Sequence, residues 1–193
     1  MRDMKRTSLA LAWFALLLPA AHAVEYAQVQ TEQSAIHFAY QQMGVAMDGS
    51  FAKFAAQLAF DPAKPAMATT AVEVELASIN TGSSEGDQEV AGKAWFNSKA
   101  FPTARFVSSK VTAAGDSRYD VAGKLTIKGQ TRDVVVPATF KAQGNSGVFE
   151  GRLTIRRGDF AIGEGVWSKF DVVANDILIK FRIAARPARA VGK

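Results

Sequence analysis

An alternation of apolar and polar residues recurs along most of the chain, and it constrains the fold more than any other feature. In residues 119–127 (YDVAGKLTI) one alternate set is apolar or glycine, and the other is Asp, Ala, Lys and Thr. Residues 72–76, 149–155 and 177–183 alternate in the same way. Successive side chains of a β-strand point to opposite faces, so this period of two predicts antiparallel strands with one buried and one solvated face.

Short polar or glycine-rich stretches separate these runs. AAGDSR (113–118), KGQT (128–131) and QGNSG (143–147) each have the length of a hairpin connection. We therefore expect seven or eight strands, with neighbours joined as a meander. Pro137 lies inside one strand, and because proline has no N–H to donate to a ladder, it indicates an edge or a bulge.

Residues 83–102 interrupt the alternation. Ser84 and Asp87 are of the types that cap helices, so we expect a short helix here. Trp95, Phe96 and Phe101 follow it, and they would form an apolar lid if this segment folded back over the sheet. A plain surface crossover fits the sequence equally well.

The apolar face of such a sheet must be hidden, either by closure into a barrel or by doubling into a sandwich. The interior of an eight-stranded barrel is either filled by side chains or holds one small ligand. Small inward residues favour a cavity for a long apolar ligand, whereas large residues packed over each glycine would give a dry core. The small residues expected on the inner face are Ala56, Gly123 and Gly151.

The first 23 of the 193 residues have the parts of a secretory signal. Arg2, Lys5 and Arg6 precede an apolar run, Leu9–Leu18, and small residues lead to Ala23. A run of about ten residues is shorter than the roughly 20 that a membrane-spanning helix needs, so a permanent anchor is the weaker interpretation. We expect export, cleavage after Ala23 and a single domain at residues 24–193.

Charge and cysteine content exclude several function classes. Removal of the leader's three cations and one Asp lowers the formal charge from +5 to +3, which is too small to indicate nucleic-acid binding. The chain has no Cys, so an exported fold must be stabilised by packing alone. His37 is the only histidine after the leader. We therefore expect no catalytic triad, metal site or cofactor.

Several separated stretches of the sequence resemble the YceI family of exported, lipocalin-like proteins. The resemblance covers essentially all of residues 24–193, and it implies an all-β fold, an eight-stranded antiparallel barrel with one short helical lid or crossover. It also implies a long isoprenoid or other lipid-like ligand, a bacterial periplasmic location and a homodimer. The matching stretches are Ser34-Ala-Ile-His-Phe38, Gly49-Ser-Phe51 with Phe54, Ile79-Asn-Thr-Gly82 with Asp87, Trp95-Phe-Asn97, Phe101-Pro102 with Phe106, Gly123-Lys-Leu-Thr-Ile-Lys-Gly-Gln-Thr131 and Arg157-Gly-Asp-Phe-Ala-Ile162.

Two positions depart from the family pattern. The frequent Asp-x-His-Leu of the family is Asp87-Gln-Glu-Val90 in this chain, so no role of that histidine carries over. The glycine that usually follows the Asp-Phe of the last motif is Ala161, which predicts an altered bend after Phe160.

Arg157 and His37 are the polar residues that most need an explanation. Arg157 is in phase with apolar strand residues, so its guanidinium would turn towards the interior, where an unpaired charge is costly. It either pairs with Asp159 or Asp176 and closes one barrel end, or meets a lipid head group such as a quinone oxygen or a pyrophosphate. His37 alternates with Phe38, so we expect it to point outward or towards a partner subunit.

We predict a binding protein that carries a polyisoprenoid or isoprenoid quinone in the periplasm, without catalysis. An enzyme that uses Tyr40, Asp159 or Arg157, and a structural barrel with a dry core, are the alternatives. The basic tail, residues 186–193, would allow a transient contact with the inner membrane. The predicted ligand-binding residues are Phe38, Tyr40, Phe54, Leu58, Phe60, Trp95, Phe96, Phe106, Tyr119, Leu125, Phe149, Phe160, Ile179, Phe181 and Arg157.

Overall fold

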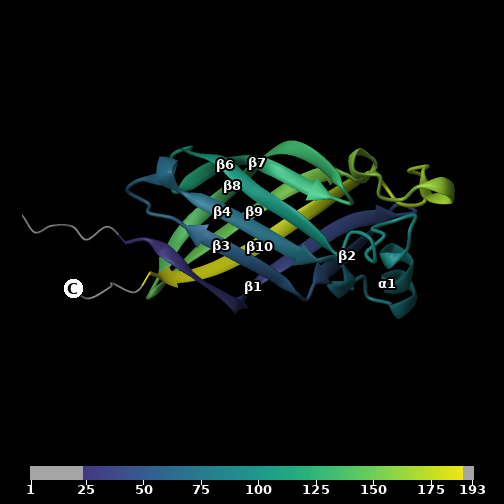
Figure 1. The fold of residues 1–193 in the computed structure, drawn as a ribbon, viewed down its shortest axis with the longest axis horizontal. Coiled ribbons are helices and arrows are strands. Elements are labelled where there is room, and N and C mark those ends of the chain that lie inside the picture. The colour runs from purple at the N-terminus through teal and green to yellow at the C-terminus, as the bar shows by residue number, and fades with distance from the viewer. Residues whose placement is uncertain (1–23, 189–193) are drawn as a thin grey trace, which may run out of the picture.

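The computed structural model describes residues 24–188, which form one curled antiparallel sheet with short helices at its ends (Figure 1). The predicted leader, residues 1–23, and the last part of the basic tail, residues 189–193, lie outside the described residues. The strands are β1 (Tyr26–Gln42), β2 (Val45–Phe51), β3 (Phe54–Ala59), β4 (Thr69–Glu75), β5 (Ile79–Asn80), β6 (Thr103–Ala113), β7 (Arg118–Ile127), β8 (Gln130–Gln143), β9 (Ser146–Arg156) and β10 (Asp176–Pro187). The helices are α1 (Ser84–Ala91) and four 3₁₀ turns, η1 (Pro65–Met67), η2 (Leu76–Ser78), η3 (Arg157–Phe160) and η4 (Gly165–Trp167).

The predicted meander is confirmed in the second half of the sheet. The order of the strands is β3-β4-β6-β7-β8-β9-β10-β1-β2-β5, and β6 to β9 are joined through the three turns expected from the sequence. Pro137 lies in β8, which pairs with β9 only from Ala138 onward. On the side that faces β9, Pro137 is therefore at the start of an unpaired edge, as its missing N–H predicted.

The first strand draws the two ends of the sheet together. Residues 36–42 of β1 pair with β2, and Tyr26 at its other end exchanges two backbone hydrogen bonds with Phe60, just after β3. The N–H of Tyr26 donates over 2.8 Å and that of Phe60 over 3.1 Å. The sheet therefore curls into the lipocalin-like barrel that the resemblance predicted.

The expected number of eight strands is wrong, because the sheet has ten. Two residues, Ala52 and Lys53, separate β2 from β3, so residues 45–59 form two strands. The two-residue strand β5 follows η2 and pairs with the end of β2. Alternation alone did not reveal either interruption.

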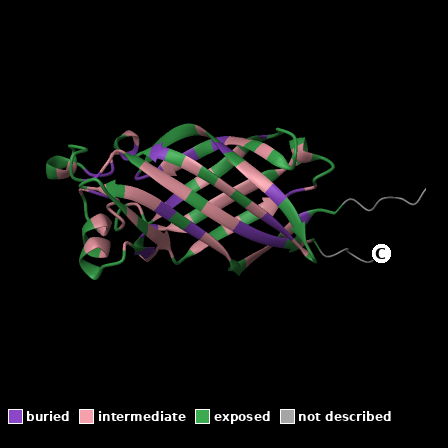
Figure 2. Ribbon diagram, turned by 180° about the vertical axis from the view of Figure 1, so that it is seen from behind, coloured by how far each residue is buried: buried purple, intermediate pink, exposed green. Residues whose placement is uncertain are grey.

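Burial follows the alternation of the sequence, and Figure 2 shows exposed and less exposed positions succeeding one another along the strands. In β7, Leu125 and Ile127 are buried, whereas Lys124 next to them is exposed. Lys124 pairs with Asp133 of β8 on the outer face, with 2.9 Å between Nζ and Oδ1. Apolar side chains thus meet inside the barrel, and charges meet outside it.

Several inward-facing rings reach with their tips over glycines of the neighbouring strand. A Cβ built at any of these glycines would overlap atoms of the ring, so the residue must be glycine for the ring to fit. The rings lie along the wall instead of crossing the lumen, which leaves space at the centre of the barrel. Phe38 covers Gly49, Phe106 covers Gly123 and Phe181 covers Gly151.

The segment between β5 and β6 contains the predicted helix. The N-cap of α1 is Ser83 instead of the expected Ser84, and its Oγ accepts a hydrogen bond from the N–H of Gly86. Asp87 accepts hydrogen bonds from the backbone N–H and the hydroxyl of Thr81, so it fixes the turn that leads into the helix. Among residues 24–188, no helix has the length and apolarity to cross a bilayer.

Candidate binding cavity

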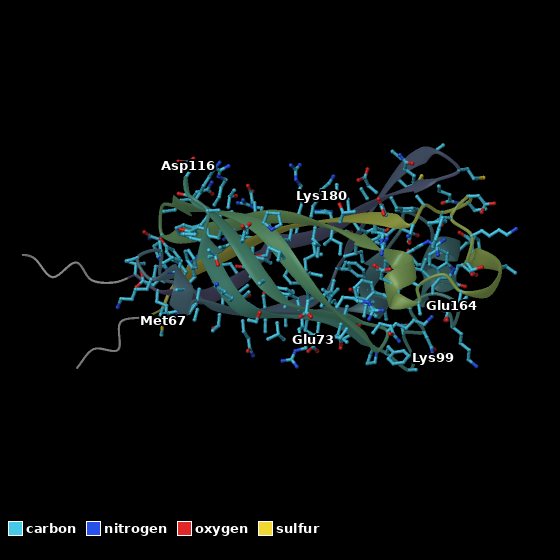
Figure 3. The ribbon with its side chains drawn as sticks, turned by 90° about the horizontal axis from the view of Figure 1, so that it is seen from above. Met67, Glu73, Lys99, Asp116, Glu164 and Lys180 are labelled. Carbon is cyan, nitrogen blue, oxygen red and sulfur yellow. The ribbon has the colours of Figure 1, made fainter. Side chains whose placement is uncertain are left out.

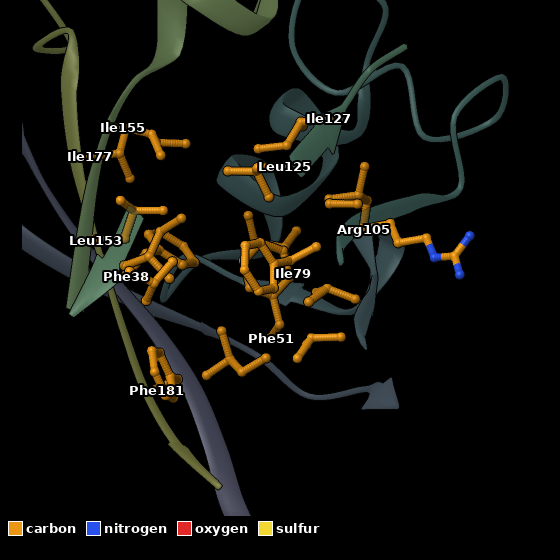
Figure 4. Close-up of a pocket in the computed structure, with 18 of the residues that line it drawn as sticks. Phe38, Phe51, Ile79, Arg105, Leu125, Ile127, Leu153, Ile155, Ile177 and Phe181 are labelled. Carbon is orange, nitrogen blue, oxygen red and sulfur yellow. The ribbon is translucent and has the colours of Figure 1, made fainter. Parts of the chain in front are cut away.

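The barrel encloses a largely apolar cavity of about 820 Å³. Figure 4 shows Phe38, Phe51, Leu125, Leu153 and Ile177 converging on it from strands that are far apart in the sequence. A cavity of this size and lining is in the range that holds a drug-sized or larger apolar ligand. The dry-core alternative is therefore not what the structure shows, although rings do cover the glycines.

Packed aromatic rings close one end of the cavity. The ring of Phe60 lies at centroid distances of 5.1 Å from Tyr119 and 5.0 Å from both Phe140 and Phe149. Tyr26 packs edge-on against Phe140 at 5.0 Å. This cluster contains the strand pair that closes the barrel, so the same residues complete the sheet and seal the cavity floor.

The opposite end of the cavity is polar and partly open. Exposed residues of the segment that includes α1, namely Ser83, Glu85 and Glu89, border the cavity there, and we call this opening the mouth. Trp167 of η4 donates its Nε1–H to Glu89 over 2.8 Å and packs at a tilt against Trp95, with 5.4 Å between ring centroids. Trp95 and Phe96 in the segment after α1 border the cavity, as expected for a lid, whereas Phe101 does not.

Thirteen of the fifteen residues predicted to bind the ligand border this cavity, and Phe54 and Phe160 do not. Contact of these thirteen residues with a ligand stays a prediction, but their convergence on one cavity follows directly from the alternation of the strands. The thirteen are Phe38, Tyr40, Leu58, Phe60, Trp95, Phe96, Phe106, Tyr119, Leu125, Phe149, Arg157, Ile179 and Phe181.

Phe54 and Phe160 lie at interruptions of the sheet. Phe54 follows the break between β2 and β3 and borders a shallow depression on the outside of the barrel, together with His37. Phe160 belongs to η3, where the chain has left the strand and alternation no longer sets the facing of a side chain. It is buried against the barrel core, with the guanidinium of Arg132 at 5.9 Å from its ring centroid.

Arg157 is buried, with 1% of its surface exposed, and its donors are occupied by backbone carbonyls. Its nitrogen atoms lie 2.8–3.2 Å from six carbonyl oxygens. The guanidinium also lies over the rings of Trp95 and Phe170, at 5.2 and 4.8 Å. The expected ion pair with Asp159 or Asp176 is therefore wrong, and Asp159 pairs with Arg156 instead. The carbonyls belong to Ile162, Gly163, Trp167, Lys169, Val173 and Ala174.

Burial and contacts determine the state of the three polar groups offered for catalysis. Burial raises the pKa of the Tyr40 phenol, so its reactive phenolate form is disfavoured. Burial also lowers the pKa of the Arg157 guanidinium, which nevertheless stays protonated in proteins and cannot act as a base. Asp159 is held by Arg156 and does not border the cavity. Of the three groups offered for catalysis, Tyr40 and Arg157 border the cavity and Asp159 does not.

His37 points to the outer face, as expected from its alternation with Phe38. It stands opposite Ser50 of β2 and Lys180 of β10. Within residues 24–188, no group of three or more acidic, histidine or cysteine side chains is placed to hold a metal ion.

Lys128 was not among the predicted site residues, yet it ties the segment after α1 to the connection between β9 and β10. Its Nζ donates to the carbonyls of Lys93 and Ala161 and to the carboxylate of Glu164, over 2.7–3.0 Å. Lys128 lies in a two-residue hairpin turn with a positive φ of 48°, a position where Asn, Asp or Gly is preferred. A lysine at a turn position that favours Asn, Asp or Gly was the feature of the sequence that could have drawn attention to Lys128.

Comparisons with known proteins agree with this geometry. A family model described as a YceI-like domain matches residues 28–185. A UPF0312 protein of Pseudomonas syringae pv. syringae is 32% identical over 169 residues, which span 82% of this chain and 88% of the relative. A UPF0312 protein of Azotobacter vinelandii is 31% identical over the same shares of the two chains.

Solved structures show the same fold. BcnA of Burkholderia cenocepacia is 40% identical and superposes with a TM-score of 0.80 over 82% of this chain and 99% of its own. A polyisoprenoid-binding domain from Saccharophagus degradans, implicated in plant cell wall breakdown, superposes at 0.65 with 13% identity, over 86% of this chain and 99% of its own. The motifs, the fold and the matched length together place this chain in the YceI-like family.

Proposed function

We propose that the protein binds one long apolar lipid, a polyisoprenoid or an isoprenoid quinone, inside the barrel and carries it without chemical change. The observation that carries this proposal is the cavity of about 820 Å³ with its nearly continuous apolar wall. The likeness to the polyisoprenoid-binding domain of Saccharophagus degradans supports it. Burial of each CH₂ contributes about 0.8 kcal/mol, so a long chain gains a large gross affinity before ordering costs are subtracted.

The charges at the cavity favour a neutral head group, such as a quinone or an alcohol, over a pyrophosphate. Of the cations among residues 24–188, Arg157 and Arg105 border the cavity. Arg157 has no free donor, and Arg105 is exposed and points away from the cavity (Figure 4). Glu85 and Glu89 stand at the mouth, where they would repel an anion.

We further propose that the mature protein acts in the periplasm after cleavage of residues 1–23, and that it forms a homodimer. The leader pattern of the sequence supports export. N-terminal sequencing of protein from the periplasmic fraction tests the first point, with Val24 expected as the first residue. Sedimentation of the mature protein tests the second.

Organic extraction of the purified protein, followed by mass spectrometry, tests carriage directly. We expect a neutral isoprenoid lipid at a stoichiometry near one. Absence of lipid, together with failure to take up a polyprenol or quinone on refolding, would contradict the proposal. Recovery of a ligand that the protein has chemically altered would favour the enzymatic alternative.

A pair of alanine substitutions provides a matched test of the cavity. Ala56 borders the cavity, whereas its neighbour Ala55 is exposed on the outer face of the same strand. Ala56→Phe places a ring in the lumen and is expected to lower the lipid stoichiometry several-fold, because the added volume occupies the site of the chain. Ala55→Phe should retain lipid at the wild-type level. Equal retention by the two variants would show that the lipid lies elsewhere.

A further inference from the structure

Five large apolar side chains are exposed at the end of the barrel that holds the mouth. Two belong to the hairpin between β1 and β2, one to η4 and two to the loop that precedes β10. We call this group the apolar rim. Its members, with their exposed fractions, are Met43 (71%), Val45 (60%), Val166 (91%), Phe170 (47%) and Val172 (37%).

Hydrogen bonds join these segments around the mouth. The N–H of Met43 donates to the carbonyl of Val172 over 2.7 Å, which ties the β1–β2 hairpin to the loop before β10. Trp167, adjacent to Val166, is tied to α1 through its bond to Glu89. In Figure 1, α1 and the yellow-green loop that contains η4 lie at the same end of the molecule, opposite the C-terminus.

The rim is continuous with the interior. Gln42 and Met47, which flank the hairpin turn, border the cavity, while Met43 and Val45 between them are exposed. An apolar chain that leaves the cavity at the mouth therefore meets apolar side chains next. Exposure of that chain to water would be unfavourable, so a shielded path for its transfer has a physical advantage.

Met43 is unfavourable for the hairpin in two respects. It forms a two-residue turn with Gly44, and φ is +49° for Met43 and +78° for Gly44, values that identify a type I′ turn. Asn, Asp or Gly is preferred at the first of these positions, because other side chains strain the backbone there. The Met43 side chain is therefore exposed at a position where a polar residue or glycine would fit the turn better.

We propose that the apolar rim docks onto the surface of a lipid bilayer, so that the carried lipid passes between membrane and cavity without crossing water. This inference rests on the proposed carriage function. Glu85 and Glu89 at the mouth and Lys169 and Asp171 beside Phe170 give this region more negative than positive charge. Docking is therefore driven by apolar insertion, as in interfacial binding, and does not require anionic lipid.

Tryptophan fluorescence can measure the docking. Of the three tryptophans, Trp95 and Trp167 remain in the mature chain, and Trp167 adjoins the rim. The mature protein, verified by mass to begin at Val24, is mixed with phosphatidylcholine vesicles whose acyl chains are brominated. We expect quenching that persists at high salt and is not increased by anionic lipid. Absence of quenching at saturating lipid would overturn the proposal.

Met43→Asn separates docking from folding. Asn is preferred at this turn position, so the variant should melt at the wild-type temperature or above it, whereas its partitioning onto vesicles should fall about fivefold. Met67→Asn is the control, because Met67 is 78% exposed and lies at the opposite end of the molecule from Glu164 (Figure 3). Equal losses in the two variants would overturn the proposal.

Sedimentation and lipid extraction separate docking from self-association and from carriage. If Met43→Asn changes self-association in sedimentation instead of vesicle binding, the rim is an interface between copies of the chain and the proposal is wrong. Lipid content is measured by extraction on the same samples. If the protein retains lipid but does not bind vesicles, docking is contradicted and carriage is not. If it binds vesicles but never holds lipid, carriage is contradicted and the basis of the inference is removed.

Discussion

Three residues with a left-handed backbone lie at the lid end of the barrel. Met43, Lys128 and Ala161 have φ values of 49°, 48° and 54°, although none of them is glycine. This conformation costs roughly 1–2 kcal/mol for a residue with a side chain. Lys128 offsets that cost with three hydrogen bonds from its Nζ, and Met43 belongs to the apolar rim. The side chain of Ala161 is a methyl group, which makes no polar contact that offsets the cost, and its carbonyl would accept from Lys128 in a glycine as well.

Ala161→Gly is therefore expected to stabilise the protein. Ala161 follows η3 at φ 54° and ψ 33°, where glycine is unstrained. We expect a gain of about 1 kcal/mol and a rise in Tm of about 2–4 °C. Thermal denaturation measures it, with Ala55→Gly in β3 as the control, which should destabilise by about 0.5–1 kcal/mol. A lower Tm for Ala161→Gly would show that the bend does not strain the alanine.

At the scale of elements, Arg157 organises the long connection between β9 and β10. This connection carries η3 and η4, and five of the six carbonyls that Arg157 binds lie between Ile162 and Val173. The connection is not paired as a strand, so its carbonyls need other donors, and a single buried guanidinium supplies them. Gly163 must remain glycine beside it, because a Cβ there would overlap the guanidinium.

Arg157→Met is expected to destabilise the protein by about 3–5 kcal/mol, because it leaves buried carbonyls without donors. The neighbouring Arg156→Met provides the control. Arg156 is largely exposed and makes one ion pair with Asp159, so its loss should cost less than about 1 kcal/mol. Urea denaturation measures both free energies, and limited proteolysis within residues 162–175 reports release of the loop. Similar stabilities for the two variants would contradict the structural role of Arg157.

At the scale of the whole molecule, ligand binding and folding stability are linked. The cavity lies at the centre of the only sheet among residues 24–188, so an emptied barrel lacks part of its apolar contacts. A ligand that binds only the folded state stabilises it, by about 2.7 kcal/mol at a free concentration of 100 times Kd.

Removal of the lipid should therefore lower the melting temperature by about 5–10 °C at that ligand concentration. Thermal scans of extracted and reloaded protein measure the difference. Ala56→Phe, which fills the cavity, should show little change on lipid addition. A wild-type protein whose melting temperature does not respond to a polyprenol or a quinone would contradict binding inside the barrel.

The fold and the cavity wall were predictable to the extent that alternation persists. Phe38, Leu125 and Phe181 lie on regular strands, and the period of two placed each of them on the inner face. Phe54 and Phe160 lie where strands break or end, and there the period no longer sets the direction of a side chain. The break at Ala52 and Lys53 accounts for one of the two unexpected strands, and the two-residue β5 is the other.

The sequence by itself determined that the chain forms an antiparallel sheet with one apolar face, because hydrophobic alternation is a local property of each strand. It also determined the hairpin turns, since their glycines and polar residues act within a few positions. Only the tertiary structure decided that rings reach over glycines of neighbouring strands and leave a cavity, and that carbonyls occupy the donors of Arg157. Those outcomes depend on residues distant in the chain, whose meeting is set by the curl of the whole sheet.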